Sequence, residues 1–376
     1  MKFKQLLAPV ALALLVQAAA AQSNVVLAGR VDMSAQQIND GVNSTKRADS
    51  GTYTASRLIF RGNEDLGGGL AAQFYLEHRF NADVGAPQSG TKFWNAQSYV
   101  ELGSTNLGSI RLGRQYAPIF WPFLFGDDTG PLRLHGYSAL QMVQRSNFVR
   151  VAAAASPLKT AGTLDAIAGG IYSIGISSGF EDNMVLYKSP NFSGFTFMAS
   201  VEAPEGYSVG GGKAFGANGE YRSGNLYVGV ALNSKEGRIP VGGGATQKIT
   251  EQVVTGMYTF GGGPFSLWGN VHPWKFTSNG APLNGHDWML GASFKSGPHW
   301  VWANYAAKTI GNGCNQCDSK GLGVGYHYLL SKRTELYASL GKNSNSANAA
   351  TTLNGFAPAA PGKNVRGLAA GIATTF

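Results

Sequence analysis

The residues best suited to chemistry in this chain are two cysteines separated by two residues, Cys314 and Cys317. A thioredoxin-type redox centre has this spacing at the start of a helix that follows a strand, and a structural zinc site needs about four ligands. Neither context surrounds the pair, whose neighbours are glycine, asparagine, glutamine and aspartate. In an oxidising compartment we expect a small loop disulfide. Two free thiols are the alternative, because so short a ring is strained.

Other candidates for catalysis are weaker. A lipid hydrolase would pair a serine with His78, but no matching serine or G-x-S-x-G elbow stands out. The run 210–213, Gly-Gly-Gly-Lys, lacks the earlier glycine of a phosphate-binding loop. Lysine and arginine are scattered among apolar residues, a pattern that argues against nucleic acid binding. The sequence therefore predicts no enzyme, no cofactor and no metal site.

Residues 1–21 are predicted to be a cleavable signal peptide. Two early lysines precede a short apolar core, Leu6 to Val16, and three alanines at 19–21 form the cleavage site. The core is too short to span a bilayer, so we expect Gln22 to begin the mature chain and export to pass the inner membrane of a Gram-negative cell. Loss of the two lysines lowers the formal net charge from +9 to +7.

The composition favours a surface that faces lipid rather than water. Charged residues make up 14% of the chain, against roughly 25% in a soluble domain, and the 52 glycines are about twice the usual share. A mean hydropathy of −0.08 argues against membrane helices, which need runs of about 20 apolar residues.

Apolar and polar residues alternate with a period of two along the mature chain. Leu58 and Phe60 share one face of a segment, while Arg57 and Arg61 share the other. The final segment places these residues on one face: Leu368, Ala370, Ile372, Thr374 and Phe376. Such alternation is typical of strands. A closed sheet pairs its backbone between strands and can sit in lipid.

Sixteen strands are predicted. Their approximate ranges are 24–38, 52–62, 69–83, 92–103, 108–115, 182–189, 195–204, 214–223, 226–236, 247–260, 264–277, 285–296, 299–308, 320–330, 333–346 and 363–376. Short and long connections alternate, as in an outer-membrane barrel, and sixteen strands leave an aqueous lumen. The predicted fold is all-β. After the signal peptide at 1–21, residues 22–376 are predicted to form a 16-stranded antiparallel transmembrane β-barrel. The connection at 115–182 is the longest, and folded inward it would narrow the pore.

Four segments resemble the general porins of β-proteobacteria, of Burkholderiales or Neisseria type. They are RGNEDLGGGL at 61–70, LGSIRLGRQ at 107–115, YKSPNFSGF at 187–195 and LSKRTELY at 330–337. The resemblance implies an outer-membrane homotrimer, a third outer loop folded into the lumen, and passive diffusion of small hydrophilic solutes and ions. It also implies contact with outer-membrane lipid and lipopolysaccharide, and a terminal Phe376 read by the barrel assembly machinery. The chain departs from the family at Ala96, where an arginine is usual, and in an apolar stretch at 151–178.

The resemblance also implies a constriction, in which arginines on the wall face acidic residues of the third loop and select solutes by charge. The residues predicted to form it are Arg57, Arg61, Arg79, Arg114, Asp127 and Asp128. Arg57 and Arg114 lie in matching motifs and Arg79 has lumen parity. Arg61 has the parity of Arg57 but could instead pair with the nearby Glu64 and Asp65. The carboxylates that compete with Asp127 and Asp128 are Asp165, Glu181 and Asp182. The arginines predict a moderate preference for anions.

Two other functions stay open. One is a substrate-specific channel for an organic acid, phosphate or sugar, with ring-stacking candidates at Trp94, Tyr116, Phe120, Trp121, Phe123 and Phe125; packing of the long loop is the alternative role for these rings. The other is a surface adhesin or anchor, favoured if the long loop plugs the lumen. We also expect part of the set Trp288, Trp300, Trp302 and Tyr305 to form aromatic girdles at the membrane interfaces.

Overall fold

The computed structural model describes residues 24–129, 179–202, 213–238, 246–278, 281–312, 314–353 and 356–376. The predicted signal peptide and most of the long connection, residues 130–178, lie outside these ranges. No helix in the described ranges is both long enough and apolar enough to cross a membrane.

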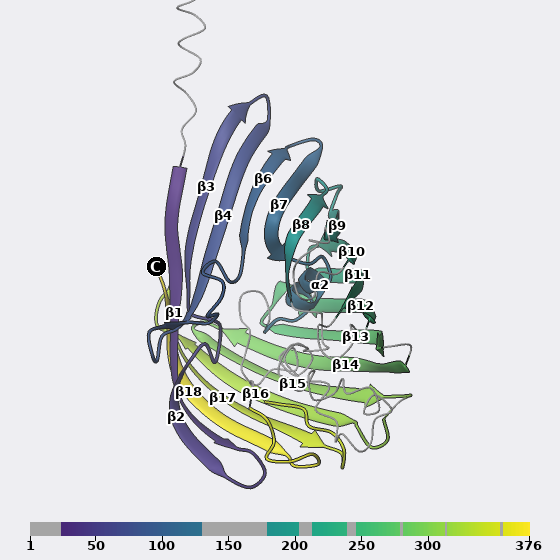
Figure 1. The fold of residues 1–376 in the computed structure, drawn as a ribbon. Helices are drawn as coiled ribbons and strands as arrows, with labels where there is room; N and C mark the ends of the chain where they lie inside the picture. The colour runs from purple at the N-terminus through teal and green to yellow at the C-terminus, as the bar shows by residue number, and fades with distance from the viewer. Residues whose placement is uncertain are drawn as a thin grey trace, which may run out of the picture.

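The described chain is dominated by antiparallel strands that follow one another around a single sheet (Figure 1). The strands are β1 (Asn24–Asn39), β2 (Ser44–Ser50), β3 (Arg57–Gly67), β4 (Leu70–Asn81), β5 (Ala86–Pro87), β6 (Ser98–Ser104), β7 (Gly108–Tyr116), β8 (Phe180–Lys188), β9 (Phe195–Glu202), β10 (Lys213–Ser223), β11 (Leu226–Arg238), β12 (Thr246–Thr259), β13 (Phe265–Ser278), β14 (Ala281–Ser296), β15 (His299–Ile310), β16 (Ser319–Leu329), β17 (Thr334–Asn345) and β18 (Val365–Thr375). A short helix, α2 (Phe120–Phe125), follows β7, and a 3₁₀ turn spans Phe260–Gly262.

Pairing between the first and last strands closes the barrel. In Figure 1, β1 (purple) lies beside β18 (yellow), and residues 30–39 pair with 366–375. On its other edge β1 pairs with β3 through residues 24–30 and with β2 through residues 33–39. β2 and β3 pair with successive halves of the same edge of β1 and so count as one strand of the barrel, and the short β5 pairs with β4 outside the main sheet. The barrel wall therefore has sixteen strands. The predicted 16-stranded antiparallel barrel is confirmed.

Alternate residues of each strand face opposite sides of the wall. On β16, for example, Leu322, Val324 and Tyr326 are exposed while His327 is buried. The outer face is therefore apolar, as lipid contact requires. Of the predicted girdle residues, Tyr305 is exposed and its ring lies 5.5 Å from that of Trp288, whereas Trp300 and Trp302 are buried on the inner face. The expectation that part of this set faces outward is confirmed.

Many glycines lie directly opposite a large ring on the next strand. A Cβ added at Gly291 would come within 2.2 Å of Trp268, and one at Gly325 within 2.3 Å of Trp302. Both are register partners across a strand pair. The ring covers the glycine backbone, so a side chain there would collide with it. Glycine abundance thus reflects close packing within the sheet as well as turns.

Most predicted strand boundaries hold to within a few residues, with three corrections. The predicted strand at 52–62 lies five residues later, at 57–67, because residues 53 and 54 donate their backbone N–H groups to the carboxylate of Asp32 instead of pairing in the sheet. The predicted loop at 39–51 is instead a tight turn at 40–43 followed by β2, a polar strand without apolar alternation. The predicted strand at 92–103 begins only at Ser98. Before it, the side chain of Asn95 accepts from the backbone N–H of Arg79 (2.7 Å) and donates to its carbonyl oxygen (2.9 Å). These side-chain hydrogen bonds of Asn95 take the place of the backbone hydrogen bonds that would have extended the strand before Ser98.

Candidate functional site

Four arginines gather on β3, β4 and β7 and form what we call the arginine wall: Arg57, Arg79, Arg111 and Arg114. Arg57 and Arg79 are directly opposed across the β3–β4 pair, and both are buried. Like charges in such a position repel. Glu77 lies between them: one of its carboxylate oxygens is 2.8 Å from Nε of Arg79 and 3.3 Å from Nη1 of Arg57. This shared carboxylate stabilises the pair.

Further polar groups fix the two guanidinium groups. Arg79 donates from Nη2 to the hydroxyl of Tyr116 (2.5 Å), and Arg57 donates to the hydroxyl of Thr54 (2.6 Å). Gln97 donates to the second oxygen of Glu77 at 3.3 Å. Each guanidinium group is therefore held by at least two polar partners, which limits its movement.

Arg111 forms the second part of the wall. Its Nε donates to Glu101, the residue opposite it on β6, at 2.6 Å. The guanidinium carbon lies 4.9 Å from the ring centre of Tyr99, which in turn stacks on Tyr75 at 5.7 Å. Stacking and ion pairing together hold Arg111 against the wall.

Arg114 completes the wall near the end of β7. It donates to Asp182 at 2.7 Å and to the backbone oxygen of Asn95 at 2.8 Å. The ring of Phe180 lies 5.3 Å from the guanidinium of Arg114 and 4.7 Å from that of Arg79. One aromatic ring thus bridges the two arginines.

A cavity of about 170 Å³ lies against this wall. Its lining combines Arg57, Arg79 and Arg111 with the rings of Tyr75, Tyr99 and Tyr116, and is completed by residues of α2. The predicted constriction residue Arg61 lies outside this lining. It is exposed on β3, opposite Tyr75, and among the described residues it forms no ion pair, so the suggested contact with Glu64 or Asp65 is not made.

Residues 117–129, which follow β7, pack against the inner face of β8 and of β10 to β14. Ile119 and Phe123 are fully buried in one cluster with Met184 and Leu186. Asn218 donates to the backbone oxygen of Pro118 at 2.9 Å. We call residues 117–129 the tethered segment.

Gly126 permits the closest approach of the tethered segment to the wall. A Cβ at this position would lie 1.8 Å from the hydroxyl oxygen of Thr255, which donates to the carbonyl of Gly126 at 3.3 Å. The φ of Gly126, −86°, is open to any residue. Lack of a side chain, rather than an unusual backbone angle, is what the site requires.

The aromatic residues of the tethered segment contact one another. The rings of Tyr116 and Phe120 stack at 3.8 Å, and Trp121 stacks on Phe125 at 5.6 Å. Phe123 meets His272 edge-on at 5.2 Å. These contacts favour the packing role over a stacking spiral for solutes.

The two aspartates of the tethered segment point away from the arginine wall. Asp127 is fully buried and accepts from the backbone N–H of Thr129 at 2.8 Å; burial raises the pKa of Asp127 to about 7. Asp128 accepts from Lys295 on β14 at 2.6 Å. No ion pair joins either aspartate to a described arginine. Of the competing carboxylates, Asp182 pairs with Arg114, Glu181 pairs with Lys235, and Asp165 lies outside the described residues.

Three members of the site were not predicted from the sequence: Glu77, Glu101 and Arg111. The period-two alternation could have indicated two of them. Glu77 is two residues from Arg79 and therefore on its face, and Arg111 lies between the apolar Ile110 and Leu112, which face lipid. The opposition of Glu101 and Arg111 depends on strand register, which alternation alone does not give.

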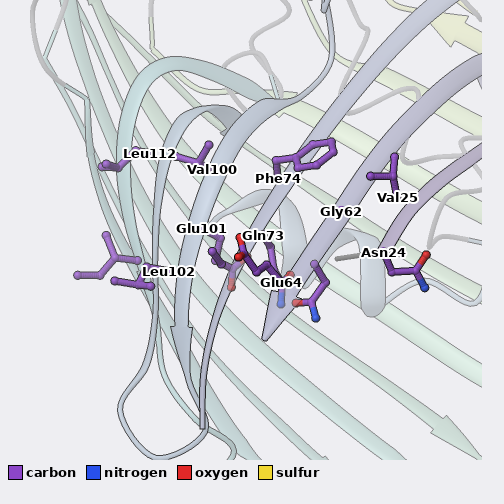
Figure 2. A pocket seen from close by; sticks show the side chains of 13 residues that line it. Asn24, Val25, Gly62, Glu64, Gln73, Phe74, Val100, Glu101, Leu102 and Leu112 are labelled. Carbon is purple, nitrogen blue, oxygen red and sulfur yellow. The ribbon is translucent and has the colours of Figure 1, made fainter. Parts of the chain in front are cut away.

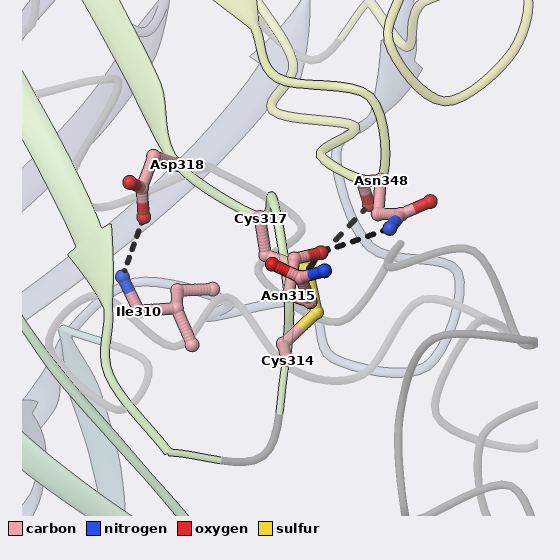
Figure 3. The surroundings of a disulfide bond; sticks show 6 residues. All are labelled: Ile310, Cys314, Asn315, Cys317, Asp318 and Asn348. Atoms are coloured by element: carbon pink, nitrogen blue, oxygen red, sulfur yellow. Dashed lines mark hydrogen bonds between the residues drawn. A yellow bond between two sulfur atoms is a disulfide. The ribbon is translucent and has the colours of Figure 1, made fainter.

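In the structure, Cys314 and Cys317 are joined by a disulfide in the connection between β15 and β16. Figure 3 shows how hydrogen bonds hold this connection to its surroundings. Asp318 accepts from the backbone N–H of Ile310 (2.9 Å), and the side chain of Asn348 donates to the carbonyl of Asn315 (2.8 Å). Within the described residues, no group of three or more His, Cys, Asp or Glu side chains is placed to hold a metal ion.

Comparison with known proteins agrees with this architecture. Residues 8–348 match the family model described as Gram-negative porin. The chain is 32% identical over 335 residues to outer membrane porin protein 32 of Delftia acidovorans, covering 86% of this chain and 84% of that protein. It is 27% identical over 215 residues to an outer membrane porin protein of Bordetella pertussis, covering 52% of this chain and 46% of that one.

Solved structures show the same fold. The anion-selective porin from Comamonas acidovorans superposes with a TM-score of 0.76 at 24% identity, covering 94% of this chain and all of that one. In vitro folded OmpT of Vibrio cholerae superposes with a TM-score of 0.66 at 14% identity, covering 95% and 100% of the two chains. The chain belongs to the Gram-negative porin family, whose members are non-enzymatic β-barrel channels of the outer membrane.

Proposed function

We propose that this porin conducts small hydrophilic anions in preference to cations, through a throat between the arginine wall and the tethered segment. The observation that carries the proposal is the gathering of four arginines on β3, β4 and β7, three of which, Arg57, Arg79 and Arg111, line one cavity. Three carboxylates accompany them, Glu77, Glu101 and Asp182, so a net positive charge is left. Exposed Arg61 adds a further charge nearby.

The arginines act at short range, which distinguishes them from the net charge of the chain. Charge spread over a wide surface is screened within about 8 Å at physiological salt, whereas charges inside a narrow, partly desolvated throat are screened less. Glu77, Glu101 and Asp182 lower the positive potential of the wall. Position 96, where related porins usually carry an arginine, holds a buried alanine and adds no charge. We therefore expect a moderate preference. The description of the Comamonas acidovorans porin as anion-selective agrees with this direction.

The tethered segment supplies the opposite side of the throat. Its attachments to Asn218, Thr255 and Lys295 fix it against β10, β12 and β14, far along the chain from β3 and β4. Phe120 and Trp121 reach the same cavity as Arg57 and Arg79. These contacts support a segment that narrows the channel without filling it.

The active assembly is proposed to be a homotrimer joined through the outer surface of β1, β3, β4, β6 and β7. A groove of about 550 Å³ lies on these strands, and Figure 2 shows the side chains that line it. Val25, Val100, Leu102 and Leu112 line it and are exposed in the single chain, and the ring of Phe74 lies over Gly62, its partner on β3. An apolar hollow of this kind fits a neighbouring subunit better than a smooth wall does.

The terminal Phe376 is proposed to be the residue that the barrel assembly machinery reads. Its ring is 53% exposed, and its backbone pairs with Gly29 at 3.1 Å in both directions. Pairing with β1 forms only when the barrel closes, so the residue is accessible before closure.

The experiment measures zero-current potentials across a planar lipid bilayer under a salt gradient. In a variant with Arg111→Gln and Arg114→Gln, the potential should move toward cation preference while conductance persists. The matched control is Lys275→Gln, which removes a charge from the outer face of β13. An unchanged potential in the double variant would show that selectivity resides elsewhere.

The 170 Å³ cavity favours a second candidate, a channel specific for an organic acid. Guanidinium groups beside tyrosine rings can hold a carboxylate and its carbon skeleton together. Such a channel would show current block that saturates with added organic acid. If added organic acid reduces the current no more than the same concentration of chloride does, this candidate is excluded.

A further inference from the structure

We propose that a bulge between β2 and β3 helps to set the ion selectivity of the channel by positioning Arg57, a role that rests on the proposed function of the arginine wall. The bulge comprises residues 51–56, which follow the end of β2 and precede the start of β3. Opposite it, β1 has only residues 31 and 32 between its pairs with β2 and its pairs with β3. Six residues therefore stand opposite two, and we call residues 51–56 the inward bulge.

The inward bulge lies on the inner side of the barrel wall. Residues 52–56 are each at most 3% exposed. Tyr53 packs in one cluster with Trp300 and Trp302, which are buried on the inner face, and its ring lies 4.7 Å from that of His327. The extra length of the hairpin is therefore turned toward the lumen and away from lipid.

Asp32 of β1 anchors the inward bulge. One of its carboxylate oxygens accepts from the backbone N–H groups of Tyr53 and Thr54, each at 2.7 Å. The other accepts from the hydroxyl of Tyr337 at 2.6 Å, and the backbone N–H of Asp32 donates to the hydroxyl of Ser56 at 3.0 Å. Asp32 is fully buried, and hydrogen bonds to a buried carboxylate are strong. They hold the bulge in one conformation.

Two groups of the inward bulge hold the guanidinium of Arg57. Its Nε donates to the carbonyl oxygen of Ala55 at 3.0 Å, and its Nη2 donates to the hydroxyl of Thr54 at 2.6 Å. On the other side, Glu77 lies 3.3 Å from Nη1 of Arg57, a longer contact than the 2.8 Å between Glu77 and Arg79. The bulge thus holds Arg57 partly away from the shared carboxylate, where it lines the cavity of the arginine wall.

Loss of the hydroxyl of Thr54 has a defined electrical consequence. Nη2 of Arg57 would lose its acceptor in a buried site, which costs free energy. Glu77 is the carboxylate beside this guanidinium, so Arg57 would turn toward it and form a closer ion pair. A closer pair neutralises more of the positive potential that solutes meet. The channel would then prefer anions less.

The experiment measures zero-current potentials of the full mature porin in a planar bilayer under a salt gradient. Thr54→Val keeps the size of the side chain and removes the acceptor, and it should lower the anion-to-cation permeability ratio by about twofold. Thr52→Val is the matched control, because Thr52 is as deeply buried in the same bulge but bonds to Ser34 of β1. This control should keep the wild-type ratio. Added to Arg57→Gln, Thr54→Val should cause no further decrease.

Two substitutions of Asp32 separate positioning from simple loss of charge. Asp32→Asn removes the charge but keeps an oxygen for the N–H groups of the inward bulge, so the anion preference should be at least that of the wild type. Asp32→Ala removes both the charge and the oxygen, so the bulge is released and the anion preference should fall. Removal of a negative charge alone would have the opposite effect, because it raises the positive potential of the lumen.

Three results would overturn the proposal: a wild-type ratio in Thr54→Val, a further decrease when Thr54→Val is added to Arg57→Gln, or a rise in anion preference in Asp32→Ala. The Arg111→Gln, Arg114→Gln variant separates the two levels. If it moves the potential and Thr54→Val does not, the arginine wall stands and positioning by the bulge fails; if neither moves it, the proposed function fails as well. Single-channel conductance checks that each variant folds, and Thr54→Val decides if Asp32→Ala does not.

Discussion

At the residue scale, the charge of the arginine wall depends on Glu77 as much as on the arginines. This buried carboxylate is shared by Arg57 and Arg79, which the β3–β4 register places opposite each other. Buried ion pairs add little net stability, but loss of one partner leaves an uncompensated charge. Glu77 therefore holds two roles: it stabilises the opposed arginines, and it weakens the positive potential that they present to solutes.

Replacement Glu77→Gln keeps the shape of the side chain and removes its charge. The zero-current potential of the variant should move further toward anions, and its thermal unfolding midpoint should fall, by a cost on the order of 3 kcal/mol for breaking a buried pair. Glu101→Gln is the control for stability, because Glu101 serves the single arginine Arg111. A potential that stays at the wild-type value would remove Glu77 from the throat.

At the element scale, the tethered segment is held by packing, by backbone hydrogen bonds and by one buried acid, Asp127. Burial raises the pKa of Asp127 to about 7 from an ordinary value of 3.8. The folded state therefore binds the proton more tightly than the unfolded state does. The resulting stability is complete below about pH 3.8 and is lost as pH rises through 7.

Asp127→Asn should remove this pH dependence. Between pH 5 and pH 8 the free energy of unfolding of the wild type should fall by no more than about 3 kcal/mol, which lowers its unfolding midpoint, and that of the variant should change less. The measurement compares both midpoints at matched ionic strength. Parallel curves for the two proteins would show that Asp127 does not titrate in this range.

The elements also show how far alternation carries a prediction. Sixteen strands follow from it because each exposes apolar residues to lipid on alternate positions, as on β16 and β18. β2 was not predicted because its sequence is polar and shows no alternation. β6 begins later than predicted, at Ser98, because the side chain of Asn95 takes the place of backbone hydrogen bonds to Arg79. The partners within the site depend on register across strands, so Arg57 and Arg79 were predicted without Glu77, and the pair of Arg111 and Glu101 was missed.

At the scale of the whole molecule, the barrel and the connection after β15 are held by different sets of hydrogen bonds. Backbone pairing from β1 to β18 holds the closed sheet, whereas hydrogen bonds to the connection after β17 hold the connection after β15. The backbone N–H of Asn348 donates to Gln316, and that of Ser346 donates to Asp318, both at 2.9 Å. These contacts join two neighbouring connections without crossing the inner face of the barrel.

The disulfide between Cys314 and Cys317 should therefore be dispensable for the channel. It closes a ring of four residues, and in the chain-entropy model so short a ring contributes only about 2 kcal/mol, all of it local to the connection. In the double variant Cys314→Ser, Cys317→Ser, single-channel conductance, trimer mobility on a semi-native gel and the unfolding midpoint of the barrel should all match the wild type. Faster proteolysis within residues 311–318 is the one change expected, because the hydrogen bonds from 346–348 remain while the covalent link is lost. Loss of the trimer or of conductance would instead mean that this connection takes part in assembly or in the pore.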